Sequence, residues 1–179
     1  MLTQEDKKNC LDLARAAIAF SLNIIDEIPL CPLEAIFHER FGLFVTLHKN
    51  GRLRGCIGYF QPYKDLYSSL IDLAKAAAFH DSRFAPVKED EFNELHIEIS
   101  ILSPLYEISN TNEIEIGRDG IYLQHPYSSG LLLPQVATEY NWDKETFLRE
   151  TCRKAGLPVS YLNDKKTKIY RFEAEIFGE

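Results

Sequence analysis

The chain has 179 residues, of which 45% are hydrophobic and 26% are charged, and its formal net charge is −7. This composition is ordinary for one globular domain that is long enough to bury a core without disulfide or metal support. The negative charge repels a phosphate backbone, so nucleic acid is not expected as a partner.

Four cysteines are scattered without a C-x-x-C pair, which argues against a zinc ribbon or a disulfide framework. They are Cys10, Cys31, Cys56 and Cys152. The first residues lack the pattern of a signal peptide, and no apolar stretch reaches the roughly 18 residues of a membrane span. We therefore expect a cytoplasmic protein with reduced thiols and without a membrane segment, a metal site or a resident cofactor.

The first elements have clear local signals. Thr3 and Asp6 resemble a capping box, which predicts the start of a helix, and apolar residues at helical spacing follow. Residues 43–48 and 52–60 flank the pair Asn-Gly at 50–51. This pair favours the positive φ angles of a type I′ turn, so the segment is predicted to be a β-hairpin.

The middle of the chain alternates between helix and strand patterns. A second amphipathic helix is predicted over residues 66–77. Strict alternation of apolar and polar residues over 95–101 predicts a strand with one buried face. Two further strands, at 113–116 and 121–124, are expected to form a second hairpin around a glycine-containing turn.

The last third is predicted to contain two helices and a strand. Pro134 opens a short helix as its first residue, and Asp143 caps another that Gly156 ends. Residues 168–177 form the final strand. Because hairpins and helices mix without a βαβ rhythm, the predicted fold class is α+β, with a mixed or antiparallel sheet and flanking helices.

The segment Leu-Arg-Gly-Cys-Ile-Gly at 53–58 is the best candidate for chemistry. Glycine inside a strand is costly, so Gly55 and Gly58 indicate a bulge, or the close approach of another backbone or a ligand. In a regular strand Arg54 and Cys56 face the same side, and a guanidinium near a thiol favours the thiolate. Alternatively, Cys56 is a small buried hydrophobe and the glycines permit a tight bend.

Four other polar residues are candidates for binding. Asp81 and Arg83 form either a structural ion pair or helix cap, or an anion-binding arginine oriented by its carboxylate. Glu98 shares a strand face with His96, the only pair with metal-ligand spacing, although a solvated polar face is the simpler interpretation. Gln135 either caps a helix or holds a ligand.

The segment at 53–58 resembles the signature of the AMMECR domain family. The resemblance extends from about residue 10 to the end of the chain, through motifs at 81–84, 97–100, 117–120, 130–136, 142–158 and 171–174. Many members of the family carry proline where this chain has Ser82 and Ala85, which is expected to loosen that loop.

The resemblance implies a single two-lobed α+β domain over residues 1–179, with both termini in the larger lobe. It also implies protein partners, because such prokaryotic proteins resemble the A component of the AmmeMemoRadiSam system, found beside a Memo-like protein and a radical S-adenosylmethionine protein. The radical chemistry would belong to the partner, since this chain lacks a C-x-x-x-C-x-x-C motif for an iron–sulfur cluster.

Two functions are therefore expected. The first is an enzyme, or an enzyme component, with a pocket around Cys56 that takes an unknown small molecule. The alternative is a non-catalytic protein-binding module or scaffold.

Overall fold

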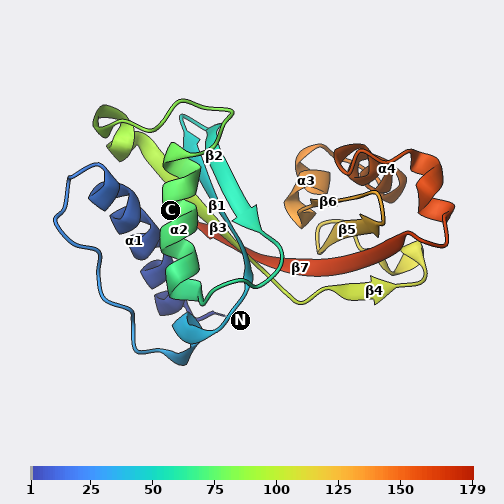
Figure 1. Ribbon diagram of the computed structural model, residues 1–179, viewed down its shortest axis with the longest axis horizontal. Helices are drawn as coiled ribbons and strands as arrows, with labels where there is room; N and C mark the ends of the chain where they lie inside the picture. The colour runs from blue at the N-terminus through green and yellow to red at the C-terminus, as the bar shows by residue number, and fades with distance from the viewer. Residues whose placement is uncertain (1) are drawn as a thin grey trace. The chain divides into compact units, whose positions relative to one another are not determined.

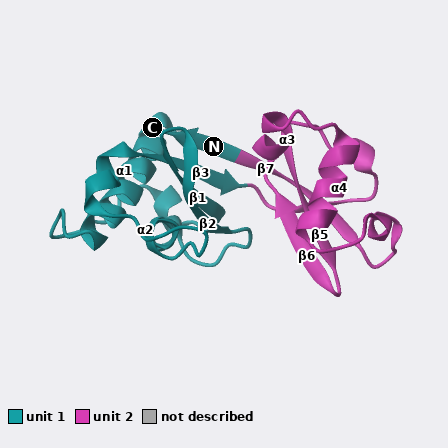
Figure 2. Ribbon diagram, turned by 90° about the horizontal axis from the view of Figure 1, so that it is seen from above, with its two compact units in different colours: residues 1–102, 175–179 teal, residues 103–174 magenta. Residues whose placement is uncertain are grey.

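The computed structural model describes residues 2–179 of the chain. These divide into two compact units (Figure 2). Unit 1 contains the chain up to residue 102 together with residues 175–179, and unit 2 contains residues 103–174. Strand pairs within each unit are antiparallel and helices flank the sheets, which confirms the predicted α+β class.

The sheet of unit 1 has β1 (Gly42–Lys49) at its centre. It pairs with β2 (Arg52–Tyr59), which is an edge strand, and with β3 (Leu95–Leu102). Helices α1 (Gln4–Ser21) and α2 (Leu66–Phe79) lie side by side over one face of this sheet (Figure 1). The core of unit 1 lies between these helices and the strands.

Local sequence signals place the first elements. The Thr3 hydroxyl accepts the N–H of Asp6, and the Asp6 carboxylate accepts the N–H of Thr3, so the predicted capping box begins α1. Asn50 and Gly51 have φ angles of 51° and 70°, as a type I′ turn requires. Both predictions are confirmed.

Strand β2 contains one residue more than β1 can pair. His48 pairs with Leu53, but the next residue back along β1, Leu47, pairs with Gly55. Arg54 therefore has no partner on β1 and forms a β-bulge. The bulge reverses the side on which every later residue of β2 lies.

Both glycines of the 53–58 segment are in contact with other parts of the chain. A Cβ atom on Gly55 would lie 2.1 Å from the carbonyl oxygen of Ala77 in α2. A Cβ on Gly58 would lie 2.4 Å from the ring of Phe44 and equally close to the carbonyl oxygen of Leu43. The space above each glycine is thus filled by backbone or an aromatic ring of this protein.

Unit 2 has the strand order β4-β7-β5-β6, with two helices packed on β5 and β6. Its elements are β4 (Tyr106–Ile108), β5 (Asp119–His125), β6 (Ser128–Leu132), α3 (Pro134–Glu139), α4 (Lys144–Lys154) and the first part of β7 (Lys168–Gly178). Pro134 is the first residue of α3, Asp143 caps α4, and Gly156 follows α4 with a φ of 68°, all as predicted.

The predicted hairpin between 113–116 and 121–124 is wrong. Residues 114–118 form a loop, because the Asp119 carboxylate accepts the Glu115 N–H at 2.8 Å and closes the chain on itself. Strand β5 pairs with β6 instead. Ile114 is nevertheless 2% exposed, so an apolar residue of the alternating pattern reaches the core from a loop.

Short 3-10 helices complete the elements within residues 2–179. They are η1 (Ala35–His38), η2 (Glu89–Glu94), η3 (Thr111–Glu113) and η4 (Val159–Asn163). In this part of the chain no helix combines the length and the apolar character needed to cross a bilayer.

The contact between Gly55 and α2 gives a first prediction. Gly55→Ala should lower the free energy of unfolding by about 1–3 kcal/mol, because its Cβ must displace helix backbone rather than a flexible side chain. Urea denaturation measures the effect. The control is Leu53→Ala, at an exposed position of the same strand, with an expected change of at most about 0.5 kcal/mol. Equal midpoints for the two variants would contradict the close contact.

Candidate functional site

Cys56 lies on the face of the unit 1 sheet that is turned away from α1 and α2. Val45 and Leu47 face the helices and are fully buried. Thr46, between them, points to the other side, and Cys56 is its partner across the ladder. The prediction of a buried, hydrophobe-like thiol is therefore not supported, because Cys56 is outside the core and partly exposed.

Three polar side chains form a row across this face. The Thr46 Oγ1 lies 3.3 Å from the Cys56 Sγ, within hydrogen-bond distance for sulfur. On the other side of Thr46, its partner on β3 is Glu98. Paired residues of antiparallel strands point to the same face, so Cys56, Thr46 and Glu98 lie in line, with the threonine in the middle.

Asp81 and Arg83 cover the free edge of β2 at Cys56. The Cys56 N–H donates to Asp81 Oδ2 at 2.9 Å, and the Cys56 carbonyl accepts from Arg83 Nη2 at 3.1 Å. The Arg83 guanidinium also donates to both Asp81 oxygens, at 2.9 and 2.6 Å. The pair therefore satisfies the backbone groups that an edge strand would otherwise expose.

The loop that carries this pair is fixed by hydrogen bonds to Asp81, although proline was expected at Ser82 and Ala85. The Arg83 N–H donates to Asp81 Oδ1 at 3.1 Å, which closes a local turn around Ser82. The Asp81 side chain is 4% exposed, whereas that of Arg83 is 55% exposed. Asp81 thus anchors the loop from inside, and Arg83 extends from it into solvent.

The electrostatics of this pair are strongly coupled. Hydrogen bonds from the Arg83 side chain hold the pKa of Asp81 well below its usual range, and the Cys56 and Arg83 N–H groups add to the effect. Asp81 in turn raises the pKa of Arg83. The Cys56 side chain adds a smaller contribution that raises the pKa of Arg83 in the same direction.

Arg54 has a different partner. Its Nε and Nη2 donate to the two oxygens of Glu91 in η2, at 3.1 and 2.7 Å. The two side chains are 15% and 14% exposed, and Lys49 donates to the same carboxylate at 3.3 Å. Arg54 and Cys56 were expected to face the same side of a regular strand. The bulge at Arg54 makes the strand irregular there, so this expectation does not apply. The arginine that binds Cys56 is Arg83, through the Cys56 backbone carbonyl.

Comparison with known proteins places this arrangement in a family. The AMMECR1 family profile matches residues 11–177. The chain belongs to the AMMECR1 family.

Relatives of similar length support the same assignment. A protein of Methanothermobacter thermautotrophicus is 42% identical over an alignment that covers 99% of this chain and 96% of the relative. A protein of Methanocaldococcus jannaschii is 40% identical, with coverages of 100% and 92%. The crystal structure of an uncharacterized protein from Pyrococcus horikoshii has a TM-score of 0.91 at 39% identity and covers 99% of this chain and 93% of that chain.

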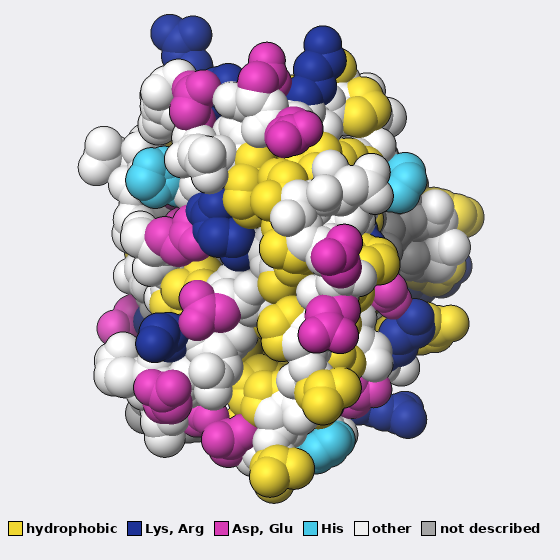
Figure 3. Space-filling view, turned by 90° about the vertical axis from the view of Figure 1, so that its left-hand side faces the viewer, with side chains coloured by type: hydrophobic (Ala, Val, Ile, Leu, Met, Phe, Trp, Pro, Cys, Tyr) yellow, Lys and Arg dark blue, Asp and Glu magenta, His cyan; other side chains and the backbone are white. Residues whose placement is uncertain are grey.

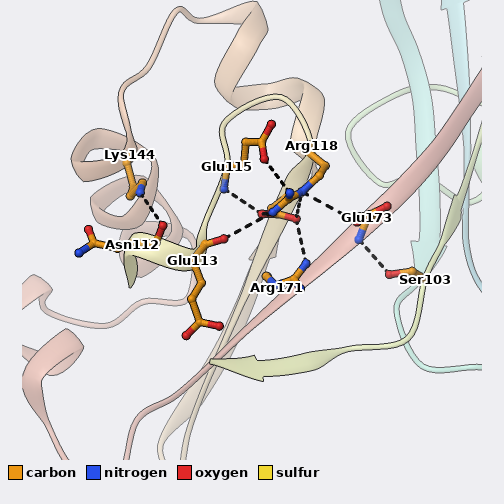
Figure 4. Close-up of polar contacts among 9 residues, drawn as sticks. Ser103, Asn112, Glu113, Glu115, Arg118, Lys144, Arg171 and Glu173 are labelled. Carbon is orange, nitrogen blue, oxygen red and sulfur yellow. Dashed lines mark hydrogen bonds and ion pairs between the residues drawn. The ribbon is translucent and has the colours of Figure 1, made fainter. Parts of the chain in front are cut away.

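The residues around Asp119 are far from Cys56 in sequence and lie within unit 2. Asp119 is fully buried and accepts from Arg118 at 2.7 and 3.0 Å and from Arg171 at 3.4 Å (Figure 4). Arg118 also donates to Glu115 at 2.6 Å. Together with the Glu115 N–H, these contacts join the 114–118 loop to β5 and β7. They give the residues around Asp119 a structural role.

The remaining predicted site residues do not join the Cys56 row. Gln135 is in α3 of unit 2, where its Oε1 is buried and accepts no hydrogen bond within residues 2–179. His96 is exposed on β3 beside the pair Glu98–Thr46. Across the described chain, no group of three or more His, Cys, Asp or Glu side chains is arranged to hold a metal ion.

Two residues of this region had no signal in the sequence. Thr46 contacts the thiol, but a regular hairpin register from the Asn-Gly turn would place Val45 opposite Cys56. Glu91 lies in a run of charged residues, 88–91, that resembles a solvated surface. Only the bulge and the position of η2 bring these side chains to Cys56 and Arg54.

The Arg54–Glu91 contact gives a prediction for pH. Hydrogen bonds from Arg54 are the main cause that lowers the pKa of Glu91 from 4.5 to about 2. A lowered folded-state pKa means that the stabilisation is complete above about pH 4.5 and is lost as the pH falls toward about 2. The stability difference between the wild type and Glu91→Gln should therefore shrink by about 2–3 kcal/mol over this range.

Urea denaturation between these pH values measures the difference. Glu89→Gln, which removes an exposed carboxylate from the same 3-10 helix, is the matched control for the loss of one negative charge. If the Glu91→Gln difference did not change between these pH values, the Arg54 contact would not stabilise the fold.

Proposed function

We propose that this AMMECR1-family protein is an enzyme, or an enzyme component, in which the Cys56 thiolate is the reactive group. The observation that carries the proposal is the setting of Cys56, whose Sγ lies 3.3 Å from the Thr46 Oγ1 and whose carbonyl accepts from the Arg83 guanidinium at 3.1 Å. A guanidinium beside a thiol favours the thiolate, which is the nucleophilic form. The partial exposure of Cys56, on the sheet face without helices, gives a reaction partner access.

Each neighbour has a distinct role in this proposal. Arg83 stabilises the thiolate charge, and Asp81 is a positioning residue that fixes the guanidinium through two hydrogen bonds. Thr46 donates or accepts at the sulfur from 3.3 Å. Glu98, next in the row, is the group placed to bind or deprotonate a small molecule that approaches along β1.

The protein partners of the proposal follow from the family. Memo-like and radical S-adenosylmethionine proteins are the proposed partners, and the radical chemistry is carried by the second of them. Cys56 would then handle a substrate or intermediate as a thiolate, in the cytoplasm. This division requires no cofactor on the present chain.

A non-catalytic binding module or scaffold is the second candidate, and two observations favour it. The glycines that could let a substrate approach are covered by Ala77 and Phe44. The Asp81–Arg83 pair already has a structural task at the edge of β2, and Asp81 offsets the charge of Arg83. In a scaffold, Cys56 is an ordinary surface thiol.

Alkylation kinetics separate the two candidates. The native protein is treated with iodoacetamide from about pH 6 to about pH 9, which spans the reference cysteine pKa of about 8.5. Labelling of the Cys56 peptide is followed by mass spectrometry. An enzyme predicts that Cys56 labels several-fold faster than free glutathione near pH 7, and that Arg83→Gln removes this advantage.

The chain supplies its own controls. Burial raises the pKa of Cys10 to about 12 and also raises that of Cys152 and of Cys31, so these peptides should label slowly in the same sample. Arg52→Gln, at an exposed position of β2, tests for a general effect of charge. Labelling of Cys56 at the glutathione rate, unchanged in Arg83→Gln, would reject the enzyme and support the scaffold.

A further inference from the structure

The segment between α1 and η1 exposes leucine side chains to an unusual degree. Leu30 is 90% exposed and Leu33 is 96% exposed. The segment is not held in a helix or strand, yet it is restrained. Pro29 and Pro32 fix their own φ angles, and the hydroxyl of Tyr67 in α2 donates to the Pro29 carbonyl at 2.8 Å. The leucines are therefore presented on a tethered backbone.

A groove of about 470 Å³ lies between this segment and α1. Leu13 of α1, which is 3% exposed, borders it from the core side, and Leu30 and Leu33 border it from the segment. Asp12 and Glu34 are its charged lining residues, and both are exposed. The groove thus combines an apolar wall with carboxylates and lacks a basic lining residue.

The connecting segment that borders the groove has the same character. Residues 16–39 contain four acidic residues and no lysine or arginine. Burial is the largest cause that raises the pKa of Cys31 in this segment, and the negative charges of Asp65 and Glu34 raise it further. On this side of unit 1, hydrophobic side chains gather in a band, with acidic side chains along it and lysine or arginine side chains also beside it (Figure 3).

We propose that this groove and the leucines beside it, Leu30 and Leu33, form a docking surface for a protein segment with apolar side chains flanked by lysine or arginine. Large exposed apolar groups with a polar border mark interaction sites, and charge complementarity selects the partner. A second copy of this chain would bring two acidic surfaces together, and an anionic bilayer would be repelled. The surface is independent of the Cys56 thiol.

The test uses two fluorescent peptides of about 14 residues with the same leucine positions, one with lysines and one with glutamates on the polar face. Fluorescence anisotropy measures their binding to the full chain. The lysine peptide should bind and the glutamate peptide should not. The double variant Leu30→Ser/Leu33→Ser should weaken binding about tenfold or more, as expected for central apolar anchors.

Two further variants test the role of charge in the groove and exclude nonspecific hydrophobic binding elsewhere on the surface. Asp12→Asn/Glu34→Gln should weaken binding several-fold and reduce its dependence on salt. Tyr127→Ser, at a residue of unit 2 that is 77% exposed, should leave binding unchanged. The melting temperature should be the same in all variants, because the changed side chains are at the surface.

Three outcomes would overturn the proposal. The first is equal binding of the two peptides, or no loss of binding in the leucine variant. The second is a concentration-dependent dimer, seen by sedimentation, that the leucine variant abolishes, which would make the occupant a second copy. The third is binding to phosphatidylglycerol vesicles that depends on Leu30 and Leu33, which would make it a membrane surface.

Discussion

The single extra residue in β2 determines which face of the unit 1 sheet carries Cys56. Counted back from the Asn-Gly turn without a bulge, Cys56 would lie opposite Val45, on the face that packs against the helices. The bulge at Arg54 moves Cys56 by one place, to Thr46, and therefore to the opposite face. The same shift turns Gly55 toward Ala77 of α2, where only a residue without Cβ fits.

Because the bulge shifts the register of β2, Arg54 and Arg83 have different roles. Arg54, at the bulge, is bound by Glu91 and is nearly as buried as its partner, so its charge serves to hold β2 against η2. Arg83 reaches the same strand from the loop after α2, and its guanidinium donates to the Cys56 carbonyl. The 53–58 segment therefore combines a structural arginine, Arg54, with a cysteine whose backbone is bound by a second arginine, Arg83, that is distant in sequence.

The sequence predicts much of this fold because its strongest signals are local. The capping box at Thr3, the Asn-Gly turn and the glycine after α4 each act through neighbours along the chain. The bulge depends instead on the packing of α2 against β2, and the contact of Thr46 with Cys56 depends on the bulge. The wrong hairpin at 113–116 has the same origin, since its alternating pattern is overridden by the buried Asp119 and its arginines in the tertiary structure.

The two proposed surfaces of unit 1 are compatible because the sheet separates them. The acidic groove lies on the outer side of the helix layer, against α1, whereas Cys56 lies beyond the strands on the face without helices. A partner with a basic, apolar segment could thus bind at Leu30 and Leu33 and leave the thiol accessible. If both proposals hold, a partner on one layer and a reactive thiol on the other fit an enzyme component better than an enzyme acting alone.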